Sequence, residues 1–130
     1  MRRMPLTLLM ATAATVALAA PAVADPTPIY APYAQAAASV SASGELLRSK
    51  NVDTVTQPLP SVYCVHISDP NINLAESVIT ATLDWQQAKD ATIRATVQPS
   101  SWCDNDNRTI AVAIFSGVQA APNDFFVTVQ

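Results

Sequence analysis

His66 is the only histidine in the chain and the first residue to consider for catalysis. The residues that could complete a Ser-His-Asp triad are Ser61, Ser68, Ser116, Asp69 and Asp84. No nucleophile elbow or other supporting motif accompanies them. We therefore predict that His66 is an ordinary strand residue with no catalytic role, and a small hydrolase using His66 is kept as an alternative.

The run Asp104-Asn105-Asp106-Asn107 alternates oxygen-bearing side chains as a calcium loop does. An EF-hand loop also requires Gly at its sixth place and Glu at its twelfth, and those places are held here by Thr109 and Phe115. We interpret the run as a polar turn and expect neither a metal nor another cofactor. Calcium binding of a different kind stays open.

Cys64 and Cys103 are the only cysteines, and too few histidines accompany them for a zinc site. In an oxidising compartment a disulfide between them is the expected state. It would close a loop of about 40 residues, for which the chain-entropy model gives roughly 4 kcal/mol of stabilisation.

The irregular segment 99–108 follows the predicted core strands and contains Cys103. We predict that it is a contact loop, because loops on β scaffolds commonly carry function. The side chains that it could present are Trp102, Asp104, Asn105, Asp106, Asn107 and Arg108. Trp102 adjoins Cys103, however, and Trp85 continues an inward-facing register, so both tryptophans are predicted to lie in the core.

Short strands separated by turn residues must position these groups. The predicted strands are 36–43, 45–50, 51–56, 61–68, 77–85, 92–98, 109–116 and 125–129. The pattern predicts an all-β fold, a small antiparallel β-sandwich or flattened barrel of about seven strands with one disulfide. Only 34–39 and 73–78 could hold a turn or two of helix.

Three finer expectations concern individual strands. The segment 61–68 is apolar on both faces and is expected inside a sheet, between two covered faces. Segments 77–85 and 92–98 are expected to pair as an antiparallel hairpin. Pro58 is expected to end the strand before it, because proline cannot donate to a ladder.

The first 24 residues resemble an export signal, with Arg2 and Arg3, an apolar stretch over 6–20, and Ala22-Val23-Ala24 before a predicted cleavage site. The apolar stretch is shorter than the roughly 20 residues that a membrane-spanning helix needs. We therefore expect a signal peptide at 1–24, a proline-rich extended segment at 25–35, a β domain at 36–130, and a secreted protein with no stable membrane insertion.

Cleavage would leave five of the seven Lys and Arg residues against ten Asp and Glu. These few cations are scattered along the chain, whereas phosphate contacts need clustered ones. Nucleic acid is therefore not an expected partner.

The runs 39–49 (SVSASGELLRS), 62–65 (VYCV) and 124–129 (DFFVTV) resemble a group of small secreted proteins, mostly from actinobacteria. The likeness spans about residues 37–130. It implies an all-β fold with no established activity, and no catalytic residue is carried over.

A second likeness joins Ile29-Tyr30-Ala31-Pro32 to the start of the secreted subtilisin-inhibitor family. That family has two disulfides, whereas this chain can form one. Inhibition, if present, would use the 99–108 loop.

Together these observations predict a secreted non-catalytic β domain that binds a protein or another component of the cell envelope. The 99–108 and 117–124 loops are the expected contact surfaces, and protease inhibition and hydrolysis by His66 are the alternatives.

Overall fold

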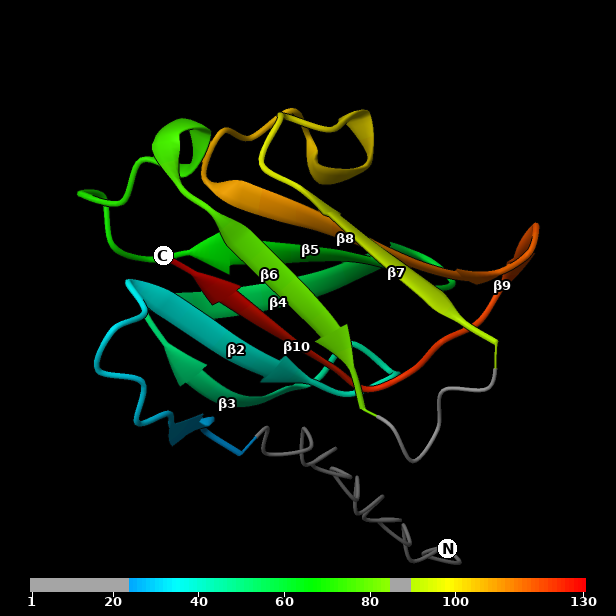
Figure 1. The fold of residues 1–130 in the computed structure, drawn as a ribbon, viewed down its shortest axis with the longest axis horizontal. Helices are drawn as coiled ribbons and strands as arrows, with labels where there is room; N and C mark the ends of the chain where they lie inside the picture. The colour runs from blue at the N-terminus through cyan, green and yellow to red at the C-terminus, as the bar shows by residue number, and fades with distance from the viewer. Residues whose placement is uncertain (1–23, 85–89) are drawn as a thin grey trace, which may run out of the picture.

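The computed structural model describes residues 24–84 and 90–130, which form two β-sheets packed face to face (Figure 1). The first sheet has the order β1 (Thr27–Pro28), β3 (Leu46–Lys50), β2 (Ala36–Val40), β10 (Phe125–Val129) and β6 (Ile79–Leu83). The second has the order β4 (Val52–Leu59), β5 (Val62–Ile67), β8 (Thr109–Ser116) and β7 (Thr92–Thr96), with β9 (Gln119–Ala120) beside β8. The predicted all-β fold is confirmed.

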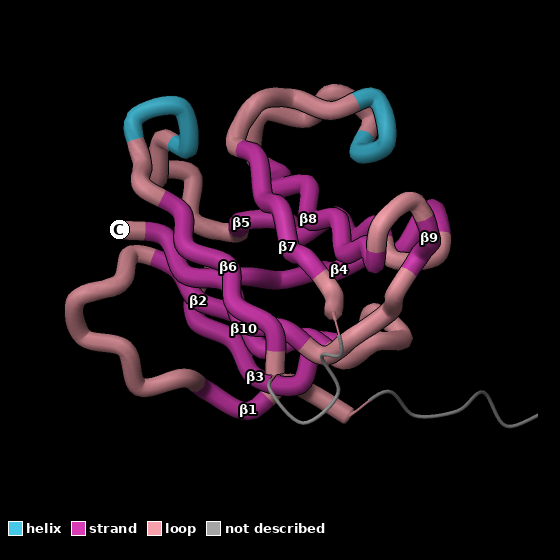
Figure 2. Tube along the Cα trace, turned by 45° about the vertical axis from the view of Figure 1, so that its right-hand side comes forward, coloured by secondary structure: helices cyan, strands magenta, loops and turns pink. Residues whose placement is uncertain are grey.

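Two short 3-10 turns lie at one end of the molecule, η1 (Leu74–Glu76) and η2 (Ser101–Cys103) (Figure 2). The first falls within 73–78, where a helical turn was expected, whereas most of 34–39 is strand. No helix in the described residues is long and apolar enough to cross a membrane. Residues 1–23 of the predicted signal peptide, and Trp85, lie outside the described ranges.

The core lies between the sheets and is built from alternate residues of their strands. Phe125, Val127 and Val129 of β10 are buried there, opposite the large inward-facing residues of β5 and β8. The Tyr63 ring packs on Phe125 at 4.9 Å between centroids, and its hydroxyl donates to the Ala42 carbonyl at 2.7 Å. The inward side of β10 is thus the one that carries its alternate apolar residues, as the period of two along a strand requires.

The predicted hairpin between 77–85 and 92–98 is wrong. β6 pairs with β10 in the first sheet, and β7 pairs with β8 in the second. Alternation determines which face of a strand is buried but does not select its partner. Here β10 offers β6 an unbroken five-residue register, and the chain then crosses to the other sheet.

Pro58 does not end its strand, because β4 continues to Leu59. β4 lies at the edge of the second sheet, and its pairing with β5 is irregular between Thr56 and Leu59. A proline without an N–H group is tolerated at such a position. By contrast, 61–68 does lie inside a sheet, since β5 lies between β4 and β8. Only one of its faces packs in the core between the sheets, however, and His66 on the other face is partly exposed, which corrects the expectation of two covered faces.

Candidate functional site

The outward-facing side of the second sheet, called here the outer face, carries most of the residues with chemical potential. Cys64 and His66 project there from β5, opposite Thr56 and Thr54 of β4. Ala111 of β8 pairs with Cys64 on one side and with Thr96 of β7 on the other. The other side of the same strands is committed to the core, so this face is the one available to a ligand.

The disulfide predicted from the sequence is present and fixes η2 on the outer face. Cys64 and Cys103 lie 5.6 Å apart at their Cα atoms and pack with Ala111 in a small buried cluster. The Ser100 side chain accepts from the Trp102 N–H at 3.3 Å, and the Ser100 carbonyl accepts from the N–H groups of Cys103 and Asn105, each at 2.9 Å. These bonds and the disulfide hold the turn in one conformation against the sheet.

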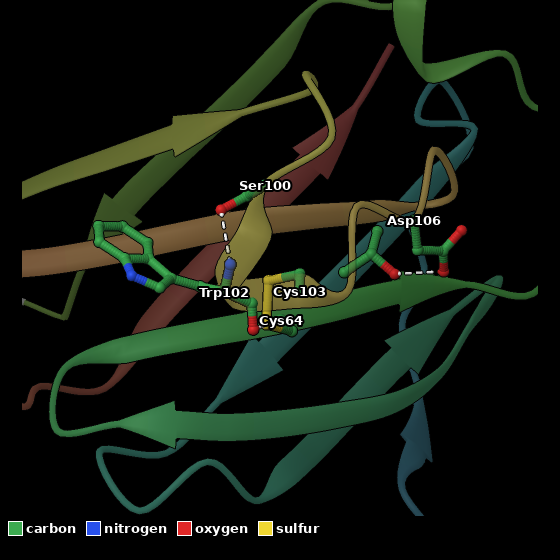
Figure 3. The surroundings of a disulfide bond; sticks show 6 residues. Cys64, Ser100, Trp102, Cys103 and Asp106 are labelled. Carbon is green, nitrogen blue, oxygen red and sulfur yellow. Dashed lines mark hydrogen bonds between the residues drawn. A yellow bond between two sulfur atoms is a disulfide. The ribbon is translucent and has the colours of Figure 1, made fainter.

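Trp102 is not a core residue, which corrects the expectation from the sequence, because 49% of its surface is exposed. Figure 3 shows its ring pointing away from the disulfide, along the sheet. Neighbouring residues of a tight turn project in different directions, so the bond that buries Cys103 leaves Trp102 at the surface. Adjacency to a disulfide therefore anchors the tryptophan without burying it.

Two other residues of the 99–108 loop bond to the protein itself. Arg108 donates from Nη2 to the carbonyls of Ile67 at 2.8 Å and Ser68 at 2.7 Å. The Asp106 carboxylate accepts from the Arg108 N–H at 3.0 Å and from the Thr109 hydroxyl at 2.8 Å. Both side chains stabilise the loop, which leaves Trp102 and the exposed Asp104, Asn105 and Asn107 as its outward groups.

His66 lies between two carboxylates, one of which the sequence did not single out. Its Nδ1 is 2.6 Å from Oδ1 of Asp53, and its Nε2 is 3.6 Å from Oδ2 of Asp106. No triad is formed among the residues that the structure describes, because both ring nitrogens face carboxylates and neither faces the hydroxyl of Ser61, Ser68 or Ser116. Ser61 is also fully buried, and Ser116 is at the opposite end of β8 from the residue that pairs with His66. With carboxylates facing both ring nitrogens, His66 links β4 to the 99–108 loop.

The pKa values of Asp53 and Asp106 are both lowered, which favours their ionised forms. Partial burial acts to raise the pKa of Asp53, but the hydrogen bond and positive charge offered by His66 outweigh it, so this pKa lies below its usual value. The Arg108 N–H, followed by the Thr109 hydroxyl, lowers the pKa of Asp106. Nevertheless, no group of three or more His, Cys, Asp or Glu side chains within 24–84 and 90–130 is placed to hold a metal ion.

Two hollows flank Trp102 on the outer face. One, of about 480 Å³, lies over β7 and β8 and includes Arg94 and Phe115. The other, of about 430 Å³, lies over β4 and β5 and includes His66. Trp102 lines both, so the turn that carries it divides the outer face into two recesses.

Comparison with protein-family models, with curated proteins and with solved structures finds no match for this chain. The two resemblances noted from the sequence therefore stay predictions, and the geometry of the outer face carries the functional argument.

Proposed function

We propose that this chain is a secreted, non-catalytic binding domain that contacts a component of the cell envelope through the outer face around Trp102. The observation that carries this proposal is a half-exposed tryptophan on a disulfide-anchored turn between two hollows. Tryptophan is among the residues most often responsible for binding energy at interfaces.

The rigidity of the turn supports the same function. A backbone segment already held in place loses little conformational freedom when a partner binds, so more of the contact energy of the side chain that it carries appears as affinity. Cys103 and the hydrogen bonds to Ser100 supply that preorganisation.

The disulfide is consistent with an extracellular or otherwise oxidising environment. Secretion itself is part of the proposal and is supported by the charged, apolar and small-residue pattern of 1–24.

The alternatives have less support from the geometry. The 99–108 loop closes into a 3-10 turn followed by left-handed residues at Asp104 and Asn105, which is not an extended segment of the kind that enters a protease cleft. Hydrolysis by His66 would need a hydroxyl group facing one of its ring nitrogens. In the described part of the chain both nitrogens face carboxylates instead.

A matched pair of aromatic variants tests the proposal. Trp102→Ala removes the outer-face aromatic, and Phe126→Ala removes a residue of similar exposure, 44%, on the first sheet. The full chain is expressed in a secreting host, so that any processing near residue 24 is left to the host. The purified protein is then immobilised and exposed to envelope extract of the producing organism.

We expect a component that is retained by wild type and by Phe126→Ala and lost with Trp102→Ala. Circular dichroism confirms that both variants are folded. A component retained equally by all three proteins would remove Trp102 from the binding surface and refute the proposal.

A further inference from the structure

We propose that the hollow over β7 and β8 binds a small amphiphilic carboxylate, with its apolar body on the alanines of β8 and its carboxylate paired with Arg94. The proposal rests on the proposed function and specifies the chemistry of one of its two recesses. The hollow measures about 480 Å³, which is within the usual range for small-molecule sites.

Small side chains on β8 form the floor of the hollow. Ala111 and Ala113 point outward from this strand, while the larger Ile110, Val112 and Ile114 point into the core. Ala111 is buried against the disulfide, so it closes the hollow at the end near η2. Ala113 is partly exposed, and its methyl group leaves room above the sheet that a larger side chain would fill. The floor is therefore apolar and open to a ligand at Ala113.

Aromatic rings stand at both ends of this floor. Phe115 follows Ala113 along the outward register of β8, and Trp102 projects from η2 beside Ala111. Four residues of strand separate positions 111 and 115, which corresponds to about 13 Å. A hydrocarbon chain or flat ring system lying along β8 would contact both aromatic side chains.

Arg94 is the one charged side chain among the residues that line this hollow. It projects from β7 directly beside Ala113, so its guanidinium belongs to the same face as the apolar floor. In the described part of the chain, no hydrogen bond or ion pair joins the side chain of Arg94 to another residue. A guanidinium in this setting is suited to a carboxylate, which it can bind through two parallel hydrogen bonds.

The hollow over β4 and β5 differs in charge from the Arg94 hollow, so an anion should prefer the Arg94 hollow. Asp104 and Asp106 line the hollow over β4 and β5 together with His66, so an anion placed there would face two carboxylates. The Arg94 hollow has hydroxyl groups at Thr92, Thr96 and Ser100 but no acid. An anionic amphiphile is therefore directed to one side of Trp102.

Two probes with the same hydrocarbon tail and opposite head groups test the assignment. Decanoate and decyltrimethylammonium are titrated into the folded, disulfide-bonded protein by calorimetry, below the concentration at which either forms micelles. We expect saturable binding of decanoate and at least roughly tenfold weaker binding of the cation, as the loss of a charge-assisted pair implies.

Three variants locate the site. Arg94→Gln should weaken decanoate binding roughly tenfold, and Ala113→Phe should abolish it by filling the floor. Arg48→Gln removes an exposed cation from β3 of the first sheet and should leave binding unchanged. Equal binding of the two probes, binding of neither, or decanoate binding that survives both Arg94→Gln and Ala113→Phe would overturn the proposal.

These outcomes are separable from those of the envelope-capture experiment. If the envelope component is captured in a Trp102-dependent way but decanoate does not bind, the proposed function is retained and this ligand is rejected. If decanoate binds in an Arg94-dependent way but Trp102→Ala does not change capture, the ligand is retained and the proposed function is rejected.

Discussion

Removing the Cys64–Cys103 bond should cost this domain a large part of its stability. The bond joins residues 39 positions apart and ties η2 to β5. The chain-entropy relation for a loop of that length gives about 4 kcal/mol, because the cross-link restricts the unfolded chain. A typical domain has a total stability of only about 5–15 kcal/mol. The midpoint of thermal unfolding should therefore fall by roughly 20 °C.

The measurement compares wild type, reduced wild type and Cys64→Ala/Cys103→Ala by urea and thermal unfolding. Reduced wild type controls for the packing of the sulfur atoms with Ala111, since it keeps both of them. We expect the two bond-free proteins to be destabilised to a similar extent and to remain folded, because the core between the sheets contains neither cysteine. A loss below about 1 kcal/mol in both would refute the loop-entropy reasoning.

Three further predictions follow from the core, the turns and the acids. Phe125→Ala should lower the free energy of unfolding, measured with a chemical denaturant, by about 3–5 kcal/mol, because Phe125 is fully buried. Phe126→Ala, at the exposed neighbour, should lower it little. Equal losses in the two variants would contradict the assigned register of β10. Gly44→Ala should lower stability by about 1–3 kcal/mol, and by more than Gly117→Ala. Both glycines have positive φ, but a Cβ at Gly44 would also meet a side-chain carbon at 3.2 Å, while Gly117 has open space around it. Since the pKa of Asp53 is lowered in the folded protein, its contribution is present above the ordinary value of 3.8 and is lost as pH falls through the folded value. Asp53→Asn should therefore flatten the acid side of the stability–pH profile, by no more than about 1 kcal/mol because the group is largely exposed. An unchanged profile would show that the contact with His66 contributes nothing.

The sequence predicts most of the strands, because burial of one face leaves a period of two along many of them. Strands β8 and β10 coincide with the predicted segments 109–116 and 125–129. The pairing of β6 could not be obtained in this way, since its inward residues are compatible with any neighbour in the same layer.

The candidate site is less predictable for a related reason. Asp53 reaches His66 only because β4 and β5 pair across the tight turn after Leu59, and its own sequence neighbourhood carries no sign of that contact. The exposure of Trp102 depends on the direction in which each residue of η2 projects. Spacing along the chain contains no information on either point.

One feature of the outer face is visible in the sequence when residue size is considered together with polarity. In 109–116 both faces are apolar, which by polarity alone predicts that both are covered. The inward positions hold Ile110, Val112 and Ile114, whereas the outward ones include Ala111 and Ala113. Large residues are expected on the face of a strand that packs against another sheet. Small residues on the opposite face leave a depression in the surface. The hollow beside Arg94 is thus a consequence of small outward residues, and replacing Ala113 with a larger residue should fill it without disturbing the core between the sheets.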